Sequence, residues 1–300
     1  MDGVLVIDKP VGPTSHDIVA VVRRVLRERR VGHTGTLDPL ASGVLPLVLG
    51  RATRLASLLS ATEKTYEAGV RLGGSTATYD AAERVASGAP PPPAPATDVR
   101  EVARVLDEFR GEFDQMPPPY SAKKVGGVAA YKLARRHEAP ALKPVRVRVS
   151  DLEMIGLDEG LVRLRVTASA GFYVRSLAHD IGVRLGCGAH LEALRRTGAA
   201  GFGLDRAVTI EELQGSDSWR QRIVPLEEVA GHIPALMLNE RGAKRARHGN
   251  AVGPGEIGDP SLAATLQIDA RVRLFDPEGA LLAIAIVGPD GVLRPSVVLV

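Results

Sequence analysis

The chain has 300 residues, of which 45% are hydrophobic and 24% charged, values that exclude an extended, charge-rich disordered chain. A chain of this length can bury a sizeable core, as one big domain or as a large domain with a small one. The net charge is only +3, although the pI of about 9.1 is compatible with a polyanionic partner.

Cysteine content and hydropathy narrow the setting further. The single cysteine, Cys187, cannot form an internal disulfide, and no spaced set of Cys and His could hold zinc. No apolar run approaches the length of a membrane span, and the N-terminus lacks the pattern of a signal peptide. We therefore expect a cytoplasmic protein that is neither exported nor inserted into a membrane.

The N-terminal segment predicts a strand followed by a helix. Residues 3–10, GVLVIDKP, are typical of a short buried strand that ends in a Lys-Pro turn. Pro13 with Thr14 or Ser15 is a helix-start signal, and the apolar positions that follow predict an amphipathic helix. The end of this segment is basic, because Glu28 is its single acid among five arginines: Arg23, Arg24, Arg27, Arg29 and Arg30. Such a run is typical either of a solvated charged face or of a contact with phosphates.

Residues 32–43, GHTGTLDPLASG, place one aspartate between glycines and a proline. The glycines permit close approach of a ligand to the backbone, and Pro39 biases Asp38 away from helical geometry. The apolar run at 44–50, VLPLVLG, would anchor this loop to the core. On local chemistry alone, the segment is equally typical of a turn in which the carboxylate bonds its own backbone.

The next elements are a strand, a low-complexity tract and a helix. Residues 64–73, KTYEAGVRLG, alternate apolar and polar side chains, which predicts a strand with Tyr66 on its apolar side. The tract at 88–96, GAPPPPAPA, indicates an exposed spacer, with binding to a proline-reading module as the alternative. Asp98 and Glu101 have the spacing of a capping box at the start of a helix.

Between Gln115 and Ser150 the only acid is Glu138. One-sided charge with interleaved tyrosines predicts contact with a nucleic-acid backbone, and a solubilising basic loop is the alternative. The eight basic residues of this segment are Lys123, Lys124, Lys132, Arg135, Arg136, Lys143, Arg146 and Arg148.

The C-terminal half begins with two alternating segments, 145–149 and 162–166, which predict half-buried strands. Arg175 then stands where a further strand meets a helix. The charged stretch 211–222 is expected to be peripheral. Beyond Pro234 a basic helix and three short strand-like runs predict a small β-rich barrel appended to the main domain.

The loop that contains Asp38 resembles the catalytic motif of the TruB family of tRNA pseudouridine synthases. The similarity includes His33, Thr34, Gly35, the run from Leu37 to Pro39, and Gly43. It continues through the segments KTY, TYDAAE, YVRSL and HLEALRR, and covers nearly the whole chain. The C-terminal segment is similar, less closely, to the PUA-like RNA-binding module of bacterial members.

The resemblance implies a fold and an activity. The fold would be α+β, with a mixed, mainly antiparallel sheet of pseudouridine-synthase type flanked by helices. Residues 1–232 would form the catalytic domain, with a basic RNA-gripping insertion at about 120–150, and 233–300 the PUA-like barrel. The reaction would be isomerisation of uridine 55, in the T-loop of tRNA, to pseudouridine. Neither a cofactor nor a metal nor an obligatory protein partner is implied.

The resemblance also implies roles for individual residues. Asp38 would attack C1′ of the ribose or C6 of the base, which requires the ionised carboxylate that a neighbouring arginine favours. Tyr66 and Arg175 would complete the catalytic set. The substrate-binding residues would be His33, bracing the space left by the everted base, Tyr173, Leu194 and Asp80, together with Lys123, Lys124, Arg135 and Arg136.

Two other functions fit parts of the sequence. A guide-RNA-dependent member of the same superfamily would share the aspartate motif but would act inside a multi-protein particle. A non-enzymatic RNA-binding or RNA-folding protein would use only the basic segments. The compact chain with its own terminal module favours a stand-alone enzyme, and the set of Asp38, Tyr66 and Arg175 favours catalysis.

Overall fold

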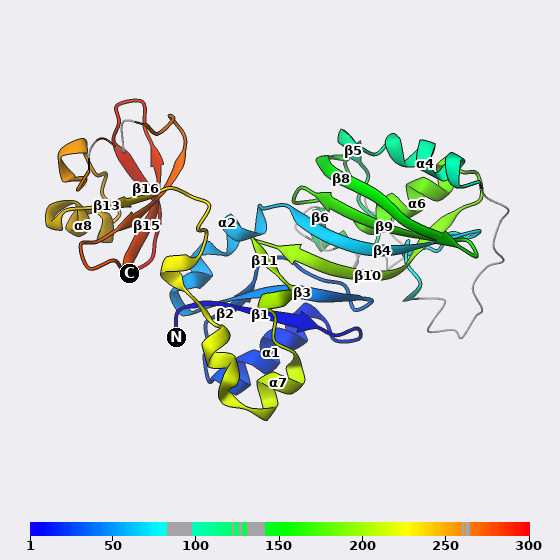
Figure 1. Cartoon of the computed structure of the whole chain (residues 1–300), viewed down its shortest axis with the longest axis horizontal. Coiled ribbons are helices and arrows are strands. Elements are labelled where there is room, and N and C mark those ends of the chain that lie inside the picture. The colour runs from blue at the N-terminus through cyan, green and yellow to red at the C-terminus, as the bar shows by residue number, and fades with distance from the viewer. Residues whose placement is uncertain (83–97, 122, 126–127, 131–141, 260, 262–264) are drawn as a thin grey trace.

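The computed structural model describes residues 1–82, 98–121, 123–125, 128–130, 142–259, 261 and 265–300 (Figure 1). The proline tract at 88–96 therefore lies outside the described residues. None of the described helices is long and apolar enough to cross a membrane.

A large mixed sheet organises the first three quarters of the chain. Its strands run in the order β12-β1-β3-β10-β4-β9-β8-β5, with β2 paired to β3 and β11 paired to β10. Every pairing is antiparallel except that of β10 with β3. The prediction of a mixed, mainly antiparallel sheet is confirmed. The strands are β1 (Gly3–Lys9), β2 (Val31–His33), β3 (Ala41–Leu49), β4 (Lys64–Leu72), β5 (Gly111–Gln115), β8 (Val145–Asp158), β9 (Leu161–Ala168), β10 (Ala189–Ala199), β11 (Phe202–Gly203) and β12 (Val224–Pro225).

The strands differ in how many of their faces are buried. In β1, Leu5 and Ile7 join one apolar cluster while Val4 and Val6 join a second cluster on the opposite face. A strand covered on both faces has a continuous apolar sequence, as β1 does. β4 instead alternates, with Tyr66 and the other even-numbered positions buried, as predicted.

Helices cover the sheet in two pairs. α1 (Ser15–Leu26) and α7 (Ile210–Gly215) lie against the β1–β3 end, whereas α6 (Val174–Arg184) packs on β10 and β4 and α4 (Val99–Asp107) packs on β8 and α6 (Figure 1). Apolar residues of all four helices belong to one cluster with the sheet. The two pairs therefore share a face of the twisted sheet, and the candidate site lies between them.

Helix starts were largely predictable from sequence. Thr14 caps α1 and Thr209 caps α7, each by a reciprocal capping box. Asp98 caps α4 by accepting from the Arg100 amide, while the Glu101 amide bonds the Asp98 carbonyl, so the predicted box is replaced by a simpler cap. The prediction that residues 211–222 are peripheral was wrong for Trp219, which is almost fully buried in η3 (Asp217–Arg222).

The C-terminal unit contains a four-stranded sheet in the order β13-β14-β15-β16, with an apolar cluster of its own. The described pairings leave this sheet open, so the predicted small β-rich barrel is not confirmed. Its elements are β13 (Ala235–Met237), α8 (Glu240–Arg247), β14 (Arg271–Phe275), β15 (Leu281–Val287) and β16 (Leu293–Val298).

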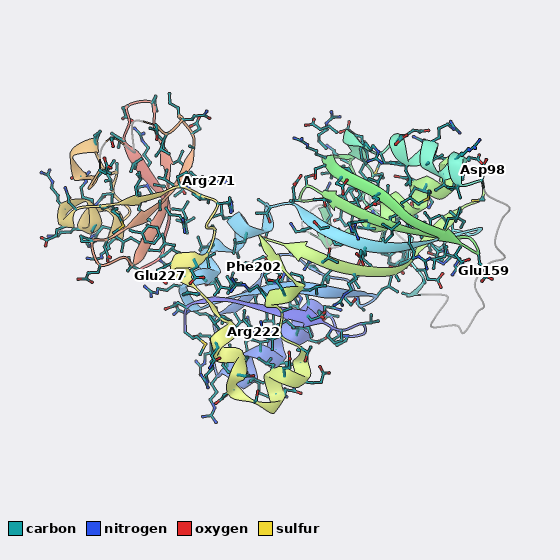
Figure 2. All side chains as sticks on the ribbon, in the orientation of Figure 1. Asp98, Glu159, Phe202, Arg222, Glu227 and Arg271 are labelled. Carbon is teal, nitrogen blue, oxygen red and sulfur yellow. The ribbon has the colours of Figure 1, made fainter. Side chains whose placement is uncertain are left out.

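Apolar packing joins the two units. Leu55 and Leu59, from η1 (Gly50–Leu55) and α2 (Ala56–Ser60), share a cluster with Phe275 and Leu299. Arg273 of β14 donates to the linker carbonyls of Glu227 and Ile233 at 3.0 and 2.9 Å. Figure 2 shows Glu227 and Phe202 in this junction, where the ring of Phe202 packs against the same cluster. The C-terminal unit is therefore held against α2, whose last residue, Ser60, reaches the candidate site.

Candidate active site

A cavity of about 280 Å³ lies between the two helix pairs. This volume is near the lower end of the range for small-ligand sites, about 300–1,000 Å³. Its walls come from the loop after β2, the end of α2, strands β4 and β10, and the start of α6. The lining residues are Gly35, Thr36, Leu37, Asp38, Ser60, Lys64, Tyr66, Gly171, Phe172, Tyr173, Val174, Arg175, Leu194 and Arg196.

The loop that carries Asp38 is fixed from both sides. The Ser15 hydroxyl donates to the Leu37 carbonyl at 3.1 Å and accepts from the Leu37 amide at 2.8 Å. After the aspartate, the Ala41 amide bonds the Asp38 carbonyl at 3.0 Å, and the buried Lys9 ammonium bonds the Ala41 carbonyl at 2.6 Å. These contacts hold the aspartate in a defined turn, so its position does not depend on the carboxylate bonding its own backbone.

Gly43 explains how this loop reaches the sheet. At φ +101° it lies directly opposite Arg196, in the one parallel pairing of the main sheet. A Cβ built there would fall on the Arg196 carbonyl oxygen. At Gly43 the close approach is therefore made by β10 of the protein itself, whereas the sequence predicted that a ligand would make it.

Arg175 contacts the aspartate directly. Its Nε lies 2.9 Å from Asp38 Oδ2, and 42% of the Asp38 side chain remains exposed towards the cavity while the arginine is 8% exposed. Nη1 and Nη2 donate to the Thr78 and Tyr120 carbonyls at 3.0 and 2.9 Å. The two carbonyls therefore fix Nη1 and Nη2 of the planar guanidinium, and its Nε faces the Asp38 carboxylate.

Asp80 lies behind Arg175 and away from the cavity. Its Oδ2 is 3.6 Å from Arg175 Nη1, and its Oδ1 accepts from the Thr78 hydroxyl and the Ala82 amide at 2.8 and 3.1 Å. The structure therefore brings Asp80 to the predicted site as a partner of the arginine, beyond reach of a ligand in the cavity.

Tyr66 forms one wall and lies directly opposite Arg196 in the β4–β10 pairing. Burial raises the pKa of the Tyr66 hydroxyl, and a hydrogen bond from the Arg196 guanidinium together with its charge opposes part of that rise. At neutral pH the side chain is therefore a protonated phenol. Arg196 is itself buried, and its Nε and Nη2 donate to the Val44 and Gly35 carbonyls at 2.7 and 3.1 Å.

Tyr173 and Leu194 complete the predicted walls. The Tyr173 amide and carbonyl are both bonded by the buried Gln115 side chain, at 2.8 and 3.0 Å. Burial raises the pKa of the Tyr173 hydroxyl, while the neighbouring Ser121 hydroxyl and the charge of Arg175 oppose the rise. Leu194 is 9% exposed and faces the cavity. The sequence predicted the end of a strand at Phe172–Val174, whereas Tyr173 instead precedes α6 as its N-cap residue.

Other predicted residues lie elsewhere. His33 is not among the residues that line the cavity: it is on β2, edge-on to His16 with ring centroids 5.5 Å apart. Burial and two neighbouring positive groups, His16 and Arg196, lower its pKa. Lys123 donates to the Lys143 carbonyl at 3.3 Å. Only the backbone of Lys124, in β6 (Lys124–Val125), is described, and Arg135 and Arg136 lie outside the described residues.

In the folded protein, neighbouring carboxylates offset part of the positive charge of the 115–150 segment. Arg146 lies opposite Asp114 on β5, with Glu112 and Asp114 oxygens 3.3 and 3.8 Å from its guanidinium. A count along the segment misses these acids because they precede it in the chain. The free positive charge of this region is therefore smaller than the sequence predicted.

Sequence reasoning missed three cations at the site: Lys9, Lys64 and Arg196. Lys64 precedes Tyr66 by two residues, and Arg196 follows Leu194 by two, so the period of a strand places each on the cavity face. From this two-residue periodicity, Lys64 and Arg196 could have been predicted to face the cavity. This periodicity was overlooked because charged residues are rarely expected on a buried face.

The site offers an accessible carboxylate paired with an arginine, and a pocket that suits one planar ring. No group of three or more metal-binding side chains occurs among the described residues. The accessible Asp38 carboxylate, which Arg175 holds at the cavity, is suited to covalent chemistry on a small, ring-containing substrate unit.

Two family models match the chain. The N-terminal domain model of TruB family pseudouridylate synthases matches residues 23–174, and the C-terminal domain model of tRNA pseudouridylate synthase B matches 175–230. Proteins named tRNA pseudouridine synthase B from Solibacter usitatus and Burkholderia lata are 46% and 42% identical to it. These alignments cover 83% and 99% of this chain, and 85% and 89% of the respective relatives.

Two solved structures are similar to this chain over nearly its whole length. A chain of a Cbf5-Nop10-Gar1 complex superposes with a TM-score of 0.75 at 26% identity, covering 99% of this chain and 85% of that one. A chain of an H/ACA RNP bound to a substrate RNA containing 2′-deoxyuridine gives 0.73 at 25% identity, with 99% and 85% covered.

Proposed function

Because the chain belongs to the TruB family and isomerises a uridine of tRNA to pseudouridine, we propose that Asp38 is the nucleophile and that its target is uridine 55 of the T-arm. One observation carries this proposal. Asp38 is the carboxylate that both borders the cavity and pairs with a buried arginine, at 2.9 Å from Arg175.

The chemistry follows from that pair. An ionised carboxylate attacks C1′ of the ribose or C6 of the pyrimidine, and the bond from C1′ to N1 breaks. The detached base turns, C5 bonds to C1′, the Asp38 ester is released, the hydrogen on C5 leaves as a proton, and N1 takes up a proton. Arg175 holds one oxygen of the carboxylate, so the nucleophile approaches in a single orientation. Nothing is oxidised, and substrate and product have the same mass.

The walls of the cavity support a role in holding an everted base. Swinging a uridine out of folded RNA costs a few kcal/mol, which contacts in the pocket must offset. Tyr66 and Leu194 provide apolar surface, and Tyr173, whose backbone is fixed by Gln115, contributes a ring. His33, which lies on β2 and outside the cavity lining, would contact RNA around the vacated position rather than the base itself.

Contacts with the rest of tRNA are proposed for the basic segments. We assign residues 1–232 to the catalytic domain and 233–300 to an RNA-binding module of PUA type, built here on an open sheet. Lys123, Lys124, Arg135 and Arg136 would contact phosphates. The apolar junction at Leu59 and Phe275 supports a fixed distance between module and cavity.

We further propose that the enzyme acts in the cytoplasm without an obligatory protein partner. Relatives at 40–46% identity are named as tRNA enzymes, whereas the chains from a Cbf5-Nop10-Gar1 complex and from an H/ACA RNP are 26% and 25% identical. A guide-dependent role is therefore disfavoured.

The test is Asp38→Asn, which preserves the size of the side chain and removes its charge. We expect no detectable pseudouridine on an unmodified tRNA transcript and tRNA affinity within about threefold of the wild type, because Asp38 contributes chemistry rather than binding. Substantial turnover by this variant would eliminate the nucleophile assignment. A transcript with uridine 55 replaced by cytidine tests the target position.

A further inference from the structure

The cavity holds more positive than negative charge. The charged groups of its described lining are the carboxylate of Asp38 and three cations, those of Lys64, Arg175 and Arg196. Arg175 is already balanced by Asp38 and Asp80. Lys64 and Arg196 form no ion pair with a carboxylate among the described residues; their charged groups instead donate to backbone carbonyls and, from Arg196, to the Tyr66 hydroxyl.

Buried cations without a counter-ion are costly, so their retention needs a reason. The reaction supplies one, because a unit of negative charge moves during it. When the Asp38 carboxylate forms its bond it becomes a neutral ester, and its electron pair displaces a pair onto the pyrimidine. Attack at C1′ sends the pair to N1 and the ring carbonyl oxygens, and attack at C6 sends it to C5 and O4. In both forms the aspartate loses one negative charge and the ring gains it.

We propose that Lys64, with Arg196 beside it, binds the negative charge that the pyrimidine carries once Asp38 has reacted. This inference deepens the proposed function and rests on it. Lys64 is the catalytic residue in this assignment, since it borders the cavity, whereas Arg196 is a positioning residue that also holds Tyr66 and the Gly35 carbonyl.

The geometry of Lys64 suits this task. Its ammonium donates to the Ser60 and Thr62 carbonyls at 2.8 and 2.7 Å, which fixes Nζ at the end of α2 and uses two of its three N–H groups. The third is available to the cavity. A preorganised donor of this kind stabilises charge that develops during the reaction without having to reorganise, and removing one such donor typically costs about 100- to 1,000-fold in rate.

The ionisation of Lys64 predicts a pH dependence of the activity that a purely structural lysine would not produce. Burial, and then the neighbouring charge of Arg196, lower the pKa of Lys64 to about 8. The other charged or titratable groups facing the cavity are Asp38 on the β2–β3 loop, Tyr66 on β4, and Tyr173 and Arg175 at the start of α6. Burial raises the pKa of both tyrosines, so each titrates above Lys64.

The direction of the pH effect follows from the charge of the lysine. The charged form of Lys64 is the active one, so activity should be full below its pKa and should fall as the pH rises through it. Bound tRNA is a polyanion and shifts this fall upwards from about pH 8. An arginine at position 64 remains charged throughout the range and should remove the fall.

The experiment compares the wild type with Lys64→Gln and Lys64→Arg in single-turnover reactions on tRNA labelled with tritium at C5 of uridine, from about pH 7 to 10. We expect Lys64→Gln to be slower by about 100-fold or more at about pH 7.5, with tRNA affinity within about threefold. We expect Lys64→Arg to keep at least about a tenth of the wild-type rate and to lack the alkaline fall. Thermal melting checks the fold of each variant.

Two results would overturn the inference. One is a Lys64→Gln rate within about threefold of the wild type, and the other is a rate that falls at alkaline pH in Lys64→Arg as it does in the wild type. If Lys64→Gln does not fold, the profile of Lys64→Arg decides alone. Asp38→Asn, run alongside, separates the two proposals. Activity in that variant refutes the nucleophile, whereas an inactive Asp38→Asn with an active Lys64→Gln refutes only the role of Lys64.

Discussion

Replacing Arg175 by lysine tests the ion pair on which the catalytic assignment depends. The arginine uses three nitrogens in three directions: Nε towards Asp38, Nη1 towards Thr78 and Asp80, and Nη2 towards Tyr120. A lysine keeps the charge but has a single nitrogen on a flexible stem, so it cannot hold the carboxylate and both carbonyls together.

The interactions of Arg175 set the expected size of the effect. A hydrogen bond to a charged group contributes about 1.5–3 kcal/mol, and each 1.36 kcal/mol is about a factor of ten in rate. If the bond to Asp38 is absent from the transition state, kcat should fall about 10- to 150-fold. The Thr78 and Tyr120 carbonyls would also be left without a buried donor, at about 1–3 kcal/mol each, so the free energy of unfolding should fall by about 2–6 kcal/mol.

The assay is the single-turnover release of tritium from C5 of uridine in labelled tRNA, performed well below the melting temperature of the variant. The matched control is Arg184→Lys, on the same helix, where Arg184 forms an exposed ion pair with Glu108 at 2.9 Å. Exposed pairs contribute about 0–1 kcal/mol, so this control should stay within about twofold. The reasoning is refuted if Arg175→Lys turns over within about threefold of the wild type, or if it changes only KM.

Two further predictions concern the loop glycine and the basic segment. Gly43→Ala should lower the free energy of unfolding in urea by more than about 3 kcal/mol, because a methyl group would overlap the Arg196 carbonyl. Gly12→Ala, at a similar φ of +111° but in open space, should cost only about 1–2 kcal/mol, and equal destabilisation by the two substitutions would contradict this expectation. Replacing Lys123, Lys124, Arg135 and Arg136 by glutamine should weaken tRNA binding and reduce its salt dependence, by about 0.7–0.9 in the slope of log K against log salt for each phosphate that is no longer neutralised. The control Arg146→Gln should change the slope less, because Glu112 and Asp114 already offset its charge, and an unchanged slope in the fourfold variant would exclude phosphate binding by that segment.

Local features of the fold could be predicted from the sequence because their causes are local. The alternation of β4 placed Tyr66 on the buried side, and the helix-start signal at Pro13 and Thr14 predicted the start of α1. The glycines and the proline around Asp38 indicated a tight, rigid loop. Assignment of that aspartate as catalytic came from resemblance, since local chemistry equally suited an ordinary turn.

Only the tertiary structure decided which residues far apart in the chain contact one another. Arg175 meets Asp38 because α6 begins beside the β2–β3 loop, and Trp219 is buried because η3 packs onto the main core. Arg146 is partly neutralised because β8 lies beside β5. The excess positive charge of the cavity could not be counted along the sequence, because it depends on which cations share a pocket and which already have a carboxylate. Distances between charges, and their burial, exist only once the sheet has brought its strands together.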